Sequence, residues 1–181
     1  MNFEEKLGHG FELLKEKDID ASLDVARELQ KENPEDPEAF YLEGMIMQQL
    51  NQWDMSIKSL DWAIQLNDQE SRYLNLRGYA YMQNENLSKA EKDFDGSIEL
   101  DDSPSAHRNK IMLMLMSDRG GDAFSYLIDR IKKDPRDVEN WILMGDMMKR
   151  GGQIDKARTY YEQALKMDPE NEYAQRQLEE E

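Results

Sequence analysis

The chain has 181 residues, of which 39% are hydrophobic and 34% charged, and its formal net charge is −16. This length is sufficient for one domain of ordinary size with a substantial apolar core. The acidic excess argues against nonspecific binding to nucleic acid or to an anionic membrane, because both require an excess of Lys and Arg. No cysteine is present, which excludes disulfides, zinc–thiolate sites and thiol nucleophiles.

The sequence shows no targeting or membrane-spanning segment. Residues 1–18 are acidic and amphipathic, and they lack the basic start and the apolar run of a signal peptide. The longest apolar run, Ile111–Met116, is far shorter than the roughly 20 residues that span a bilayer. We therefore expect a cytoplasmic protein that does not insert into membranes, and the absence of cysteine agrees with a reducing compartment.

Segments of about 34 residues recur along the chain with similar small and bulky residues in register. The first segment, residues 3–36, is the most divergent and carries Gly10, Leu13, Ser22 and Pro34. The second, residues 37–70, carries Phe40, Gly44, Met47, Ser56, Leu60 and Ala63. The third, residues 71–103, carries Gly78, Tyr81, Ala90 and Phe94. It is one residue shorter, and we place the deletion in the turn at residues 101–103.

The last two segments differ in regularity. The fourth, residues 104–137, keeps Ala123 and Pro135 but has Ile111 where its neighbours have glycine. The fifth, residues 138–171, is the most regular and carries Trp141, Met144, Gly145, Met148, Ala157, Tyr161, Ala164 and Pro169. Residues 172–181 predict a short amphipathic helix that caps the fifth segment. Polar or glycine-rich breaks, including Gly120-Gly121 and Gly151-Gly152, predict turns inside the segments.

The fifth segment resembles a tetratricopeptide (TPR) repeat, a helix–turn–helix unit with the pattern W-x2-L-G-x2-Y…A-x3-F…P. Here Met replaces Leu, Met replaces Tyr, and Tyr replaces Phe. The resemblance implies an all-α, right-handed α–α superhelical solenoid of about five repeats plus the capping helix, with about eleven helices and no sheet. It implies one TPR domain over residues 1–181, with repeats 3–36, 37–70, 71–103, 104–137 and 138–171 and the cap at 172–181.

No group of residues indicates catalysis. The sequence lacks the HExxH, P-loop, GxGxxG and GxSxG motifs. His9 is expected on the packing side of its helix, and His107 takes the place of Trp141. Because no second His or Cys lies at metal-ligand spacing, packing roles are favoured for both histidines. We expect no enzyme activity, no catalytic residue, no cofactor and no metal.

In TPR arrays the first helix of each repeat lines a concave surface, and the resemblance maps that surface onto this sequence. We expect it to bind a peptide through Tyr41, Met45, Arg72, Asn75, Tyr79, Arg108, Asn109 and Met112. Met82 and Ile142 map to the same surface. Asn can pair with both polar groups of a peptide backbone, Tyr and Met offer adaptable apolar contact, and Arg suits a carboxylate.

The resemblance thus predicts a noncatalytic scaffold or adaptor that binds a partner peptide in the groove of the middle repeats. The fourth repeat is the one basic repeat, with 5 acidic and 7 basic residues. The carboxylate clamp of some TPR co-chaperones is matched only at Asn109, so a heat-shock partner is not supported. One alternative is a homo-oligomeric, self-assembling scaffold that uses its convex face, with Trp53 and Trp62 exposed. Another is a small acidic secretion-type chaperone.

Overall fold

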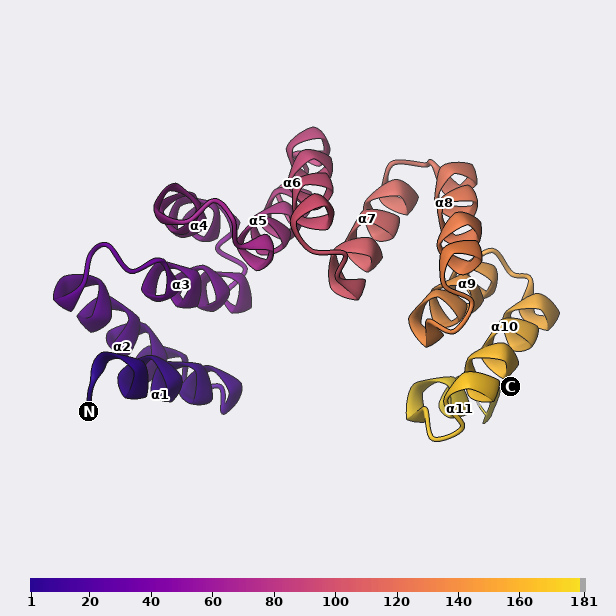
Figure 1. Ribbon diagram of the computed structural model, residues 1–181, viewed down its shortest axis with the longest axis horizontal. Helices are drawn as coiled ribbons and strands as arrows, with labels where there is room; N and C mark the ends of the chain where they lie inside the picture. Colours follow the sequence, from indigo (N-terminus) through magenta and orange to yellow (C-terminus); the bar gives the residue numbers. More distant parts are fainter. Residues whose placement is uncertain (180–181) are drawn as a thin grey trace. The chain divides into compact units, whose positions relative to one another are not determined.

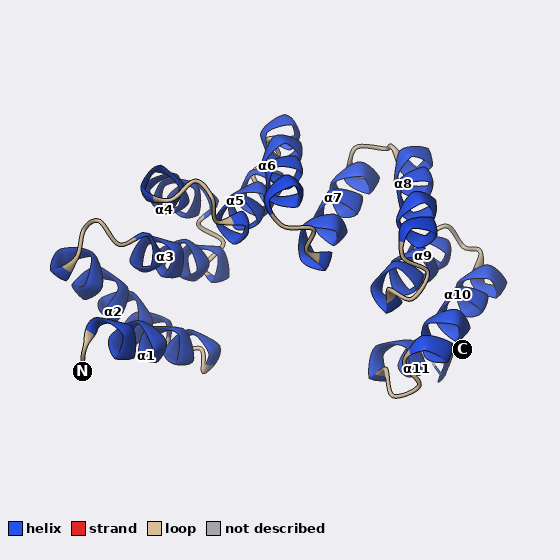
Figure 2. Ribbon diagram, viewed as in Figure 1, coloured by secondary structure: helices blue, strands red, loops and turns tan. Residues whose placement is uncertain are grey.

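The structure is a computed structural model that describes residues 1–179, and these residues form eleven α-helices and no strand (Figures 1 and 2). The all-α expectation is therefore confirmed. The helices are α1 (Phe3–Lys15), α2 (Ile19–Glu32), α3 (Pro37–Gln49), α4 (Trp53–Leu66), α5 (Ser71–Gln83), α6 (Leu87–Leu100), α7 (Pro104–Met116), α8 (Gly120–Lys133), α9 (Val138–Arg150), α10 (Ile154–Met167) and α11 (Glu172–Glu179).

The connections between helices follow a regular pattern. Three residues join the two helices of each pair, and four residues join one pair to the next. The exception is the connector between α6 and α7, which has three residues, 101–103. The third repeat is therefore one residue shorter in this connector, and the helices on both sides keep their usual lengths.

Each turn within a pair contains one residue in the left-handed backbone region. These residues have φ between 55° and 71° and are Lys17, Asn51, Glu85, Asp118 and Gly152. The expectation that Gly120 and Gly121 form a turn is wrong, because both lie in the first turn of α8 and Asp118 takes the left-handed conformation. A left-handed conformation costs an L-residue roughly 1–2 kcal/mol.

Contacts divide the chain into two compact units, Met1–Leu113 (unit 1) and Met114–Glu181 (unit 2). The boundary falls inside α7. Positions 180 and 181, the last two of the expected capping helix, lie outside the described residues. The assignment of a single domain stays a prediction.

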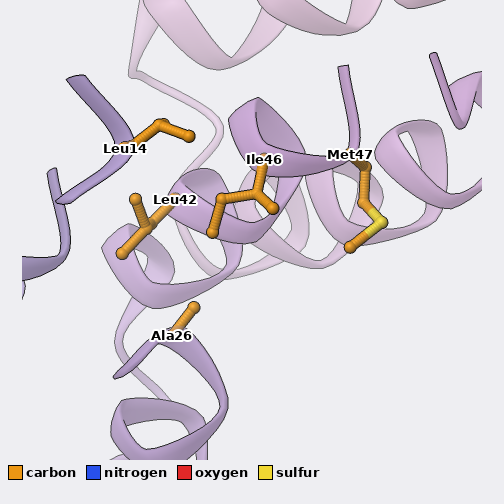
Figure 3. Close-up of a cluster of buried hydrophobic side chains, with 5 residues drawn as sticks. All are labelled: Leu14, Ala26, Leu42, Ile46 and Met47. Atoms are coloured by element: carbon orange, nitrogen blue, oxygen red, sulfur yellow. The ribbon is translucent and has the colours of Figure 1, made fainter. Parts of the chain in front are cut away.

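Unit 1 is built from helix pairs that contact both their partner and the next pair. Within pairs, α1 packs on α2, α3 on α4 and α5 on α6. Between pairs, α2 contacts α3 and α4 contacts α5, while the first helices also meet, α1 with α3 and α3 with α5. Figure 3 shows the core that joins the first two pairs, made of Leu14, Ala26, Leu42, Ile46 and Met47. The first helices therefore form one continuous row, which defines the inner face of unit 1.

Unit 2 ends with α11 packed on α10. Side chains of α11 also reach α9. The Tyr173 hydroxyl donates to Asp146 at 3.0 Å, and the Lys149 ammonium donates to the side-chain oxygen Oε1 of Gln177 at 2.8 Å. Asp146 also accepts a 2.7 Å hydrogen bond from buried Tyr161 of α10. The last helix thus engages Asp146 and Lys149, two polar residues of α9 in the fifth repeat.

Glycine in the first helix lets the two helices of a pair approach closely. A Cβ added at Gly10 would lie 3.1 Å from Val25 of the same pair and 2.7 Å from Leu42 of the next pair, so this glycine also lets the two pairs approach. A Cβ at Gly78 would lie 2.7 Å from the Phe94 ring, and one at Gly145 would lie 2.5 Å from the Tyr161 ring. Distances below 3.0 Å force the neighbour to shift, so these packings require glycine.

Gly8 and Gly10 lie in the same helix and provide a matched pair of substitutions. A Cβ at exposed Gly8 would meet no atom within 4 Å, so we expect Gly8→Ala to stabilise the fold by about 0.5–1 kcal/mol through helix propensity. Gly10→Ala is expected to destabilise it by about 1–3 kcal/mol through overpacking. Urea unfolding followed by circular dichroism measures both. Equal effects of the two substitutions would contradict the close-approach argument.

A buried ion pair joins the helices of the third pair. Arg77 donates to both carboxylate oxygens of Asp93 at 2.7 and 2.8 Å, and its third nitrogen donates to Asp61 at 2.7 Å. Asp93 is 8% exposed. Burial of Arg77 opposes its charge, but the hydrogen bonds and charges of Asp93 and Asp61 hold the pKa of Arg77 above its ordinary value.

Removing one partner of this pair leaves a charge in a dry site. We expect Arg77→Met to lower the free energy of unfolding by about 3–5 kcal/mol, because Asp93 remains buried and unpaired. The double change Arg77→Met with Asp93→Leu should recover most of the loss. Chemical denaturation of the three proteins checks this, and a double variant as unstable as Arg77→Met would refute the assignment.

Candidate functional site

All eight predicted peptide-binding residues lie in unit 1. Tyr41 and Met45 come from α3, and α5 supplies Arg72, Asn75 and Tyr79. The remaining three, Arg108, Asn109 and Met112, come from α7. Because α1, α3 and α5 form a continuous row, the α3 and α5 residues share the inner face, and Asn109 joins it through a hydrogen bond to α5 described below.

Arg72 lies at the centre of a cluster of aromatic and acidic side chains. Its Nη2 lies 2.6 Å from Glu38 and its Nε 3.2 Å from Glu70. The guanidinium carbon lies 5.0 Å from the centre of the Tyr41 ring and 5.6 Å from that of Tyr73. Burial lowers the pKa of Arg72, but the hydrogen bond that Arg72 donates to Glu70 and the charge of Glu38 raise it by more, so the pKa lies above its ordinary value.

Tyr73 completes this cluster and was not predicted as a site residue. It is fully buried, and its hydroxyl donates to Glu38 at 2.5 Å. The centres of the Tyr41 and Tyr73 rings lie 5.1 Å apart, and the centre of the Phe11 ring of α1 lies 6.2 Å from that of Tyr41. Burial raises the pKa of Tyr41. Burial and the hydrogen bond to Glu38 raise the pKa of Tyr73 even more strongly.

A chain of polar side chains crosses from α5 to α7. Asn109 donates from its Nδ2 to the Asn75 Oδ1 at 2.9 Å, and Asn75 donates from its Nδ2 to the Ser105 hydroxyl at 3.2 Å. Asn109 is half-buried, and the structure describes no donor to its Oδ1. An amide oxygen held in this way can accept a hydrogen bond from the backbone of a bound chain.

The apolar part of the inner face lies beside these amides. Tyr79 and Met112 both pack against the core cluster of Met82, Ala90, Phe94 and Leu113. The Tyr79 ring also meets Trp53 edge-on, with 6.2 Å between ring centres. Met45 packs against the core cluster of the first two pairs. Tyr79, Met112 and Met45 are half-buried, so each offers part of its side chain to a ligand.

The structure brings together some of the predicted residues and separates others. It joins Arg72 with Tyr41, and Asn75 with Asn109, in direct contacts. Arg108 is exposed. Met82 and Ile142 do not line a surface, because they are 0% and 7% exposed and belong to the cores of their repeats. The placement of these two residues on the inner face is wrong.

Three other sequence-based placements can be compared with the structure. His9 is exposed, so its expected place on the packing side of α1 is wrong. His107 is 3% exposed and hydrogen-bonded to Asp102, which confirms its packing role. Trp62 is 55% exposed as expected, whereas Trp53 is half-buried against Tyr79. Among residues 1–179, no group of three or more His, Asp and Glu side chains is placed to hold a metal.

Sequence reasoning also missed an apolar pocket that lies entirely within unit 2 and includes Gly120 and Phe124 in its lining. Gly120 was predicted only as a turn residue. The signal that could have revealed the pocket is the absence of a bulky residue at a position where the other repeats have one.

Paired helices of constant length, with a glycine contact repeated along the chain, define an α-helical repeat protein. Family models described as "Tetratricopeptide repeat" match residues 41–107 and 138–171, together more than half of the chain. The chain therefore belongs to the TPR family. No curated protein matches the sequence significantly.

Solved structures agree with this fold. A thermophilic TPR protein from Thermus thermophilus is 16% identical, with a TM-score of 0.77, and the match covers 98% of this chain and 97% of that one. PilF of Pseudomonas aeruginosa is 14% identical, with a TM-score of 0.76 and coverages of 95% and 79%. YrrB, described as a TPR protein with an unusual peptide-binding site, is 13% identical, with a TM-score of 0.63 and coverages of 94% and 89%.

TPR domains are scaffolds for protein–protein interaction, and the family is generally noncatalytic. Across the part of the chain that the structure describes, no helix has the length and apolar character needed to span a bilayer.

The buried Tyr73 phenol makes stability depend on pH in the alkaline range. Its pKa is raised in the folded state, so above pH about 10 the unfolded chain loses a proton that the folded chain retains. Stability should therefore fall with rising pH, by up to about 1.4 kcal/mol per pH unit from this group. Urea unfolding between pH 8 and 11 should show a shallower decline for Tyr73→Phe than for the wild type. Parallel declines would contradict the assignment.

Proposed function

We propose that this protein is a noncatalytic adaptor that binds an extended segment of a partner protein along the inner face of unit 1. The observation that carries the proposal is the hydrogen-bonded row of Asn109, Asn75 and Ser105 beside half-buried Tyr79 and Met112. Polar groups held in a row beside an apolar strip suit a peptide whose backbone is bonded on one side and whose side chains are packed on the other.

Asn109 is the residue best placed to bond the peptide backbone. Its amide nitrogen is fixed by Asn75, which orients its Oδ1 as an acceptor for a peptide N–H. The fixed orientation reduces the entropy lost on binding, because the side chain is already held in one geometry. Tyr79 and Met112 then supply a rigid aromatic ring and an adaptable thioether for the partner's apolar side chains.

Arg72 has a different role in this proposal from the one expected for it. Glu38 and Glu70 already lie beside its guanidinium, so the local group carries more negative than positive charge. A carboxylate of the partner would compete with both. We therefore propose that Arg72 stacks on Tyr41 and forms part of the groove wall, and that recognition depends on backbone and apolar groups rather than on a partner acid.

A second candidate function is self-assembly through the outer face. Trp62 of α4 is 55% exposed and stacks on Phe40, with 6.3 Å between ring centres. A large exposed ring backed by a second ring is a suitable anchor for a protein contact.

Three further expectations remain proposals. The adaptor is proposed to act in the cytoplasm and not to bind nucleic acid, and a small acidic secretion-type chaperone remains an alternative function.

Site-specific photo-crosslinking distinguishes the inner from the outer face. A photoreactive phenylalanine analogue is placed at Tyr79 in one protein and at Trp62 in another, and adducts formed in cells are identified by mass spectrometry. We expect partner adducts from position 79 and none from position 62. Adducts from position 62 alone would refute inner-face binding, and adducts between two copies of the chain would favour self-assembly.

Substitutions that spare the Arg72 cluster test the same surface quantitatively. Asn109→Ala combined with Tyr79→Ala should weaken binding of the crosslinked partner by about tenfold or more, because both an oriented acceptor and an aromatic contact are lost. Trp62→Ala is the matched control, since it removes an aromatic ring from the second helix of a pair. Isothermal titration calorimetry gives the affinities, and circular dichroism confirms equal helicity. Unchanged affinity in the double variant would exclude this groove.

A further inference from the structure

Unit 2 contains an apolar pocket with a volume of about 750 Å³. Its walls come from the end of α7, the first turns of α8, the end of α9 and the start of α10. Met116 and Phe124 in its lining are 53% and 38% exposed. The pocket therefore presents large apolar side chains to solvent at a place where a folded protein usually buries them.

The pocket occurs where one repeat lacks a side chain that the others have. In four of the five pairs the second helix begins with a large apolar residue, which is Ile19, Trp53, Leu87 or Ile154. In the remaining pair, formed by α7 and α8, the second helix begins with Gly120. Ile19 and Leu87 pack against core clusters, and Trp53 packs on Tyr79. A Cβ at Gly120 would meet no atom within 4 Å, so open space lies beside the residue that lines the pocket.

The charged residues in the lining are both basic. Arg150 is exposed at the end of α9, and the Lys156 ammonium donates to Gln153 at 2.7 Å. Residues 1–179 include no carboxylate within ion-pair distance of either. No acidic residue lines the pocket. In the sequence, Asp155 directly precedes Lys156, and Asp122 lies two residues after Gly120. In a chain of net charge −16, an apolar pocket with two uncompensated cations favours an acidic ligand.

We propose that this pocket is a second docking site, which receives an acidic amphipathic segment of a partner protein. A Leu, Ile or Phe side chain of that segment enters the space beside Gly120 and contacts Phe124, Met116 and Tyr160. A carboxylate near that anchor pairs with Arg150 and Lys156. The site shares no residue with the proposed inner-face groove, because all of its residues belong to unit 2.

The whole 181-residue chain is used to select binders from a displayed library of amphipathic helices of about 15 residues, with anchor and flanking positions randomised. We expect enrichment of Leu, Ile or Phe anchors flanked by Asp or Glu. Gly120→Leu supplies the missing side chain from within the chain, and should weaken the selected peptides at least tenfold. The matched control is Gly121→Leu, because Gly121 also has open space around its Cβ but does not line the pocket. It should bind as the wild type does.

Charge reversal tests the cationic part without filling the pocket, and also covers the case in which Gly120→Leu fails to fold. Lys156→Glu should weaken acidic peptides at least threefold, whereas Lys166→Glu, an exposed change in the same helix, should not.

The proposal is overturned if no selected peptide depends on Gly120, if basic peptides are enriched, or if Gly121→Leu weakens binding as much as Gly120→Leu. It is also overturned if dodecanoate, used as a small apolar anion, binds in a Gly120-dependent manner while no peptide does.

Discussion

The close contact between a glycine of the first helix and a bulky neighbouring side chain determines the geometry of four of the five helix pairs. At Gly44, Gly78 and Gly145 there is no room for a Cβ, because Leu or aromatic atoms of the second helix occupy its place, and at Gly10 the place is taken by Leu42 of the next pair. Helix axes can come this close only where one surface lacks side chains. Once the pairs are fixed, each leaves an apolar face that the next pair covers, and the first helices are brought into one row.

That row explains why side chains about one repeat apart in the sequence meet on the inner face. Glu38 and Arg72 are 34 residues apart and occupy the same position in successive repeats. Asn75 and Asn109 are also 34 residues apart, but the third repeat has 33 residues, so Asn109 lies one position beyond the counterpart of Asn75. On such a surface a residue contacts its counterpart in the next repeat or the residue beside that counterpart. Substituting one member therefore changes the surface presented by its neighbour, which is why Arg72 is a poor choice for testing ligand binding.

The repeat pattern and its resemblance to the TPR family were sufficient to predict the all-α fold and about eleven helices. The resemblance also named Asn75 and Asn109 as groove residues, but the hydrogen bond that joins them was not predicted. The pattern could not predict that Arg72 is paired internally. The repeat register places Glu38 and Arg72 at the same position of neighbouring helices, but it does not determine whether their side chains meet, and Glu70 lies outside both helices. His9 was misplaced because the packing stripe of α1 passes through Gly10 and Leu14, and a residue one position away faces solvent. Gly120 was misread because a missing side chain is visible only by comparison with its counterparts in other repeats.

The left-handed residue in each helix-pair turn has a consequence for the order of folding. Four of the five turns place Lys, Asn, Glu or Asp in a conformation that only glycine adopts freely, and the fifth turn has Gly152. In an array stabilised by nearest-neighbour contacts, folding can begin at any pair, and the pair with the least strained turn has the lowest cost of nucleation. We expect refolding of this chain to start at α9 and α10, the last of the five pairs to emerge during synthesis. A nascent chain and a denatured one would then assemble the same structure from opposite ends.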